Sequence, residues 1–76
     1  MIRDEKIRAA FAASTPPEVL AELSRDEDRN VRIGVAINTS TPPEVLLILM
    51  VDDDRGVRET AERALSKRVQ NTHQSG

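Results

Sequence analysis

Three arginines, each four residues after an aspartate, are the side chains with the clearest chemical potential. They are Arg8, Arg32 and Arg58. If they recur once per structural unit, they form a row of guanidinium groups that can bind phosphates, with an affinity that falls steeply as salt rises. The alternative is local, because an aspartate followed by an arginine four positions later forms a favourable ion pair on a helix. We favour the local pairs, since the nearby acids lower the local potential and no Trp or Tyr is present for base stacking.

Two further features could carry chemistry, and neither has the spacing that a site requires. The run of acids at residues 52–54 lacks the alternating ligands and the late Glu of a calcium loop, so we interpret it as a solvated turn. His73 has no catalytic or metal-ligand spacing to other residues, and we assign it no role. With 0 Cys, thiolate metal sites, iron–sulfur clusters and thiol nucleophiles are excluded. The sequence thus predicts no enzyme, no cofactor or metal, and no small-molecule substrate.

The composition predicts one small domain without a membrane partner. The chain has 76 residues, a hydrophobic fraction of 38% and a formal net charge of -2, which argues against a general nucleic-acid binder. Because 1% of the residues are aromatic, we expect a core of aliphatic side chains around Phe11, the lone Phe. The longest apolar run, residues 45–51, is too short to cross a bilayer. The N-terminus opens with charged residues, which is not the pattern of a signal peptide. A cytoplasmic location is the expectation.

An internal repeat organises the chain. Residues 14–38 match residues 40–64 at a shift of 26, with identity in about half of the positions. A partial first copy is matched best at a shift of 24, which aligns Arg8 with Arg32 and implies a two-residue deletion before Thr15. The sequence therefore predicts a single domain over 1–70, with a partial repeat at 1–13, repeats at 14–38 and 40–65, and a capping helix to about residue 70.

The start of each full repeat is typical of a helix N-terminus. Thr15 and Thr41 are each followed by Pro-Pro-Glu, which predicts capping boxes with the threonine as N-cap and the prolines in the first turn. Helices should therefore begin at about Pro16 and Pro42. Both should end near the acidic clusters at 26–28 and 52–54.

The second helix of each repeat follows Asp28 or Asp54, which we expect to act as N-caps. An alternative start two residues later arises because Asn30 and Gly56 tolerate a left-handed backbone. The segment 31–37 is short and contains a glycine, so it could form a strained or 3₁₀ turn that Asn38 ends. Residues 71–76 are polar and are expected to be a disordered tail.

The motifs Thr-Pro-Pro-Glu-Val-Leu-x-x-Leu, Asp-x-Asp-x-x-Val-Arg and Val-Ala-x-Asn together resemble the leucine-rich repeat variant family over about residues 4–65. The resemblance implies a right-handed superhelix that alternates α- and 3₁₀-helices. Some members carry an iron–sulfur segment, but this chain lacks the cysteines that would bind it. The expected fold class is all-α, a short right-handed helical-repeat solenoid without strands.

The most suggestive difference between the repeats lies in residues 47–51. Leu47, Ile48 and Val51 stand where the earlier repeat has Ala, Glu and Arg. Because no further repeat follows to cover this flank, the apolar stripe indicates contact with another protein or a second copy of the chain, or else cover by the C-terminal helix. We therefore expect a non-catalytic protein–protein interaction module that binds another protein or pairs with itself as a homodimer. The alternative is a phosphate or nucleic-acid backbone binder that acts through the three arginines.

Overall fold

The computed structural model describes the backbone of residues 1–74 and the side chains of residues 1–69. The described backbone is all-α and holds no strand. It forms the helices α1 (Arg3–Phe11), α2 (Pro17–Leu23), α3 (Arg29–Ile37), α4 (Pro43–Leu49) and α5 (Arg55–Gln74). The expected absence of strands over this part of the chain is thereby confirmed.

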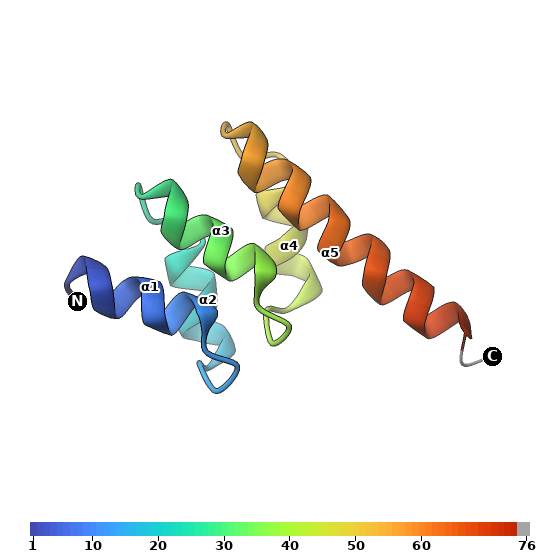
Figure 1. Cartoon of the computed structure of the whole chain (residues 1–76), viewed down its shortest axis with the longest axis horizontal. Coiled ribbons are helices and arrows are strands. Elements are labelled where there is room, and N and C mark those ends of the chain that lie inside the picture. Colours follow the sequence, from blue (N-terminus) through green and yellow to red (C-terminus); the bar gives the residue numbers. More distant parts are fainter. Residues whose placement is uncertain (75–76) are drawn as a thin grey trace.

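The helices are arranged in two layers (Figure 1). Helices α1, α3 and α5 lie side by side in chain order, and α3 packs against both of its neighbours. Helices α2 and α4 lie behind them, with α2 against α1 and α3, and α4 against α3 and α5. Each shorter rear helix therefore joins and supports two consecutive helices of the front layer.

One constant register runs through the whole array. The front helices begin at Arg3, Arg29 and Arg55, so their starts are equally spaced along the chain and repeat the shift that relates the two full copies. The predicted shift of 24 and the two-residue deletion are therefore wrong, because Ala13 and Ser14 occupy the places of Thr39 and Ser40. A matched Asp-x-x-x-Arg spacing in α1 misled the alignment. In the structural register Lys6, and not Arg8, is the counterpart of Arg32.

The core is aliphatic and lies between the two layers. Its largest fully buried apolar side chains are Leu20, Val31, Val35, Leu46, Leu49 and Val57. Phe11, which we expected at its centre, is half exposed at the end of α1. The close approach of α1 and α3 leaves no space there, since a Cβ added at Gly34 would lie 2.8 Å from both Ala10 Cβ and Phe11 Cε2. The aromatic ring therefore packs at the edge of this contact.

The rear helices begin one residue later than expected, and the predicted capping boxes are absent. Pro16 and Pro42 are the N-caps, and neither helix has a side-chain cap. Thr15 Oγ1 instead donates to the carbonyl oxygen of Ala9 at 2.6 Å, and Thr41 Oγ1 donates to that of Val35 at 2.7 Å. A cap is less needed because proline removes one of the free amides of the first turn. Each threonine thus ties its loop to the preceding front helix.

Helices α3 and α5 begin as the N-cap prediction states. The Asp28 carboxylate accepts a hydrogen bond from the amide of Asn30 at 2.9 Å, and the Asp54 carboxylate accepts one from the amide of Val57 at 3.0 Å. No residue of the described backbone has a positive φ, so the left-handed start at Asn30 or Gly56 is wrong. Each N-cap joins an aspartate to an amide two or three residues later, so the local sequence is sufficient to predict it.

The ends of the front helices differ in part from expectation. Helix α3 is a regular α-helix of 9 residues, which excludes the alternative of a strained or 3₁₀ turn. Its glycine serves the close contact with α1 and does not bend the helix. Asn38 is the C-cap, as predicted. Helix α5 continues to Gln74, past the boundary at residue 70 where the tail was expected to begin, and Ser75 and Gly76 lie outside the described residues.

Candidate interaction surface

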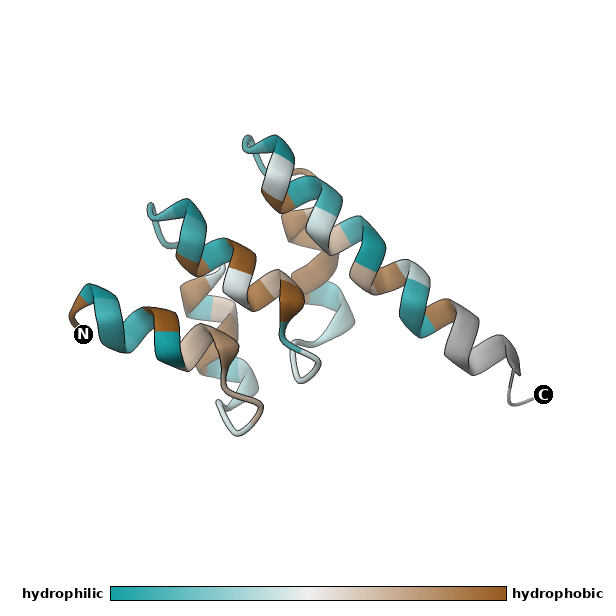
Figure 2. Cartoon of the chain, viewed as in Figure 1, coloured by the Kyte–Doolittle hydropathy of each residue, from teal (hydrophilic) through white to brown (hydrophobic). Residues whose placement is uncertain are grey.

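An apolar patch formed by Leu47, Ile48 and Val51 lies on the outer side of α4 and its last turn. These side chains are 58%, 52% and 80% exposed, whereas the opposite side of α4 is buried in the core. Figure 2 shows α4 as the most uniformly apolar helix of the array. Cover by the C-terminal helix is therefore wrong for the described residues, because α5 packs against α4 and leaves the patch open.

The patch is unusual above all in its chemistry. The equivalent positions on α2 are Ala21, Glu22 and Arg25. Glu22 and Arg25 are exposed even though α4 follows α2 in the chain. Two of the three positions are thus exposed even where a further rear helix follows, whereas Ala21 is partly buried against the core. Polar side chains are the ordinary choice on such a face, and α4 departs from it.

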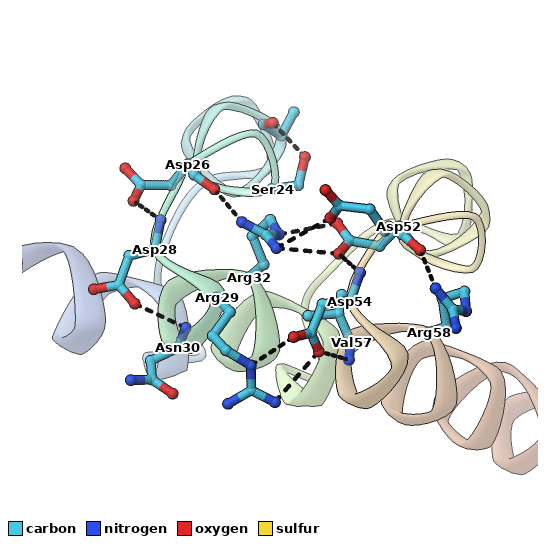
Figure 3. Close-up of polar contacts among 12 residues, drawn as sticks. Ser24, Asp26, Asp28, Arg29, Asn30, Arg32, Asp52, Asp54, Val57 and Arg58 are labelled. Atoms are coloured by element: carbon cyan, nitrogen blue, oxygen red, sulfur yellow. Dashed lines mark hydrogen bonds and ion pairs between the residues drawn. The ribbon is translucent and has the colours of Figure 1, made fainter.

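Ion pairs connect the front helices α1 and α3 with the acidic loop that follows the next rear helix, and Figure 3 shows those of α3. Lys6 Nζ lies 2.9 Å from Asp26 Oδ1, and at the equivalent place in the next unit Arg32 Nε lies 2.9 Å from Asp52 Oδ1. The bond to Asp26 raises the pKa of the Lys6 ammonium. The hydrogen bonds from Lys6 and from the backbone amide of Asp28 lower the pKa of the Asp26 carboxyl. The same contact is therefore made twice in the same register.

A second ion pair repeats beside the first. Arg3 Nε lies 2.6 Å from Asp28 Oδ2, and Arg29 Nε lies 2.7 Å from Asp54 Oδ2. The Arg29 guanidinium and then the amide of Val57 lower the pKa of the Asp54 carboxyl from 3.8 to about 2. Each acidic loop thus presents two carboxylates, two residues apart, to two bases of the preceding unit.

These contacts replace the local ion pair that we expected between Asp28 and Arg32. Arg32 pairs with Asp52 of the next loop and not with Asp28 of its own helix. Its side chain is 12% exposed, and Nη1 also donates to the carbonyl oxygen of Asp26 at 2.8 Å. Arg8 is exposed and aligns with a glycine of α3, so it does not extend a row with Arg32 and Arg58. The sequence analysis placed all three arginines in one row, but only Arg32 and Arg58 occupy equivalent positions.

Arg58 repeats one half of the Arg32 contact. Its Nη1 donates to the carbonyl oxygen of Asp52 at 2.7 Å, as Arg32 does to Asp26. Arg55, the counterpart of Arg29, pairs with Glu59 at 2.9 Å on the exposed surface of its own helix. Within the part of the chain whose side chains are described, no aspartate carboxylate pairs with these two arginines.

The acidic run at 52–54 serves as a turn between units. Asp52 and Asp54 bind arginines of α3, and Asp53 is 97% exposed with Oδ1 3.6 Å from Arg32 Nη2. Among the described side chains, no group of three His, Asp or Glu is placed to hold a metal ion. His73 lies outside the residues whose side chains are described.

A cleft between α3 and α5 was not anticipated from the sequence. It has a volume of about 600 Å³ and is lined by Ile37, Thr39, Ala64, Lys67 and Arg68. Arg68 Nη1 donates to the carbonyl oxygen of Thr41 at 2.6 Å and so fastens α5 to the loop before α4. No pattern within one repeat signals this contact, because Arg68 lies beyond the repeated positions.

No helix of the described chain combines the length and apolar character that crossing a bilayer requires. Comparison with known proteins yields no matching family model, no matching curated protein and no matching solved structure.

Proposed function

We propose that this chain is a non-catalytic protein–protein interaction module of the cytoplasm. It is a short right-handed solenoid of helical repeats that resembles the leucine-rich repeat variant family. The observation that carries the proposal is the exposed patch of Leu47, Ile48 and Val51, which stands where the earlier repeat has Ala, Glu and Arg.

Water contacts the apolar side chains of the patch, and removing them from water favours association. Burying a large aliphatic side chain contributes about 1.5 to 3 kcal/mol, so three of them favour association before the entropic cost of binding is subtracted. Three side chains alone are a small contact compared with a standard interface. The partner must therefore also engage the polar residues that surround the patch.

The structure offers less support for a phosphate or nucleic-acid backbone binder. Arg32 is held by a carboxylate and a carbonyl oxygen, and Lys6 is held by Asp26. A phosphate would have to displace these groups, and Arg8 stands outside the register. We therefore do not extend the proposal to nucleic acid.

Site-specific photo-crosslinking tests the proposed function. A photoreactive amino acid at Ile48 should give discrete protein adducts in the native cell, whereas the same group at the equivalent position Glu22 should give few. Mass spectrometry of the adducts identifies the partner. Equal labelling from the two positions would contradict a partner at the patch.

A second copy of the chain is one candidate partner. If the patches of two copies meet, sedimentation should show a dimer at high concentration. The double variant Leu47→Ala/Val51→Arg installs the residues of α2 and should then sediment as a folded monomer. Identical sedimentation of both proteins would exclude the homodimer and leave a different protein as the partner.

A further inference from the structure

The cleft between α3 and α5 lies where these two front helices part. Helix α3 ends at Ile37 and its chain turns back toward α4, whereas α5 continues past this level (Figure 1). A smaller hollow of about 140 Å³ adjoins the cleft and shares Ile37, Ala64 and Lys67 with it. Together the two hollows form a groove along residues 60–68 of α5, which is about 12 Å long at the rise of an α-helix.

A difference in residue size accounts for the groove. Gly34 lets α1 and α3 approach closely, since a Cβ added there would lie 2.8 Å from both Ala10 Cβ and Phe11 Cε2. At the equivalent positions of the next contact, Thr60 replaces the glycine and Ile37 replaces the phenylalanine. The larger threonine prevents the same approach of α3 and α5, and the shorter aliphatic side chain leaves the space beside it open. Ile37 is 51% exposed and is the largest apolar residue of the groove.

The rim of the groove is basic. Arg63 and Lys67 lie one helical turn apart on α5, both are exposed, and none of the described residues that line the groove is acidic. Among the side chains of residues 1–69, neither of the two has an ion-pair partner, whereas Arg29 and Arg32 of α3 both hold carboxylates. Two like charges at this spacing destabilise a helix, so an anion bound between them would relieve their repulsion.

Arg68 forms a fixed wall of the groove. Its guanidinium donates to the carbonyl oxygens of Asn38, Thr39 and Thr41 at 3.3, 3.1 and 2.6 Å. These hydrogen bonds fasten the arginine to the end of α3 and the loop that follows. It therefore adds positive potential to the groove, and the binding of an anion falls to Arg63 and Lys67.

We propose that the groove is a second docking site, which binds a short acidic segment of a partner polypeptide. One large aliphatic side chain of the segment lies on Ile37 and Ala64, and the carboxylates beside it pair with Arg63 and Lys67. This site goes beyond the proposed function, because it shares no residue with the apolar patch on α4.

The surroundings of the groove favour a polypeptide over a nucleic acid. Its floor is apolar at Ile37 and Ala64, which a side chain can cover and a phosphate cannot. Glu59 and Glu62 precede Arg63 within about one turn of α5, so a polyanion that extends along this helix would meet like charges. The basic stretch thus matches a few carboxylates and not a long phosphate backbone.

A synthetic peptide of the sequence Gly-Glu-Glu-Leu-Glu-Glu-Gly, capped at both ends, is the probe. Titrated into the isotope-labelled full chain and followed by NMR, it should bind saturably, with an affinity that falls as salt screens the ion pairs. Serine in place of its leucine should weaken binding about tenfold, because the aliphatic contact is lost. Glutamine in place of its four glutamates should weaken binding at least about threefold.

Substitutions in the full chain test the role of the two bases. Arg63→Gln/Lys67→Gln should weaken peptide binding at least about threefold. The matched control is Arg8→Gln/Arg25→Gln, which removes the same charge from exposed positions outside the groove and should leave the affinity unchanged. Circular dichroism should show both variants folded, because all four side chains are exposed.

The amide resonances that move on titration locate the peptide. Those of Ile37, Thr39 and Ala64 should shift, and those of Leu47 and Ile48 on α4 should not. Shifts confined to α4 would overturn the proposal, as would equal affinity of the two double variants or the absence of saturable binding at millimolar peptide. A duplex oligonucleotide that displaces the peptide and binds more tightly would also overturn it, in favour of nucleic acid. Photo-crosslinking from Ile48 is independent of all these results.

Discussion

Replacing Asn38 with Ala should destabilise the fold more than any other single polar substitution in the loops. The side chain is buried, and Nδ2 donates at 2.8 Å to the carbonyl oxygens of both Ala10 and Ala12. Its Oδ1 accepts a hydrogen bond from the amide of Ser40 at 2.9 Å. One amide therefore joins the ends of α1 and α3 and shapes the loop that leads to α4.

The magnitude follows from the three hydrogen bonds. At about 1 kcal/mol for each, Asn38→Ala should lower the free energy of unfolding by about 3 kcal/mol. A chain of this length has a total stability of roughly 4 to 11 kcal/mol, so the loss is a large part of it. The melting temperature should fall by about 12 to 24 °C. Asn38→Asp should also be destabilising at neutral pH, since a carboxylate would then face two carbonyl oxygens.

Circular dichroism melts and urea titrations of the variants measure these effects. Asn30→Ala is the matched control, because its side chain is exposed and the helix cap uses only its backbone amide. The control should remain within about 0.5 kcal/mol of the wild type. If Asn38→Ala were as stable as this control, the reasoning that these hydrogen bonds hold the units together would be wrong.

Three further outcomes follow from the structure. Thr41→Val should cost about 1 to 2 kcal/mol by urea titration and Thr15→Val less, because only the Thr41 hydroxyl is fully buried; equal costs would contradict this. Gly34→Ala should lower stability by about 1 to 3 kcal/mol, since its methyl group would collide with α1, and a neutral effect would show that α1 moves freely. Because the pKa of Asp54 is held at about 2, its pairing with Arg29 stabilises the fold above about pH 4 and is lost as the pH falls toward 2. Urea titrations across this range should show a smaller acid loss for Asp54→Asn than for the wild type.

Much of the fold could be predicted because its signals are local. The N-caps at Asp28 and Asp54 and the stop at Asn38 depend on the residue and its immediate neighbours. The helical content and the apolar core positions follow from spacing within a single helix. The exposed stripe on α4 was also found, because comparison of two repeats shows which position has changed its chemistry.

The remaining features depend on contacts between units, which spacing within a repeat does not contain. The hydroxyls of Thr15 and Thr41 resemble N-caps in sequence, but the preceding helix offers them a carbonyl oxygen. Arg32 has an aspartate four residues earlier, yet the geometry favours Asp52 of the next loop. The register of α1 was misjudged because a short matched spacing around Arg8 outweighed weaker similarity over the whole helix.

The separation of charges in each unit has a consequence for how such an array can change in length. Bases lie on the front helix and acids lie in the loop that follows the rear helix, so the pairs of Arg29 with Asp54 and of Arg32 with Asp52 both lie within residues 29–54. An in-frame duplication of residues 29–54 would carry its own bases and its own acids. The new copy would pair its own bases with its own acids without a compensating substitution, whereas an insertion within residues 29–54 that is not a whole unit would separate the charges. The ion pairs of this protein are therefore compatible with lengthening of the array by whole units.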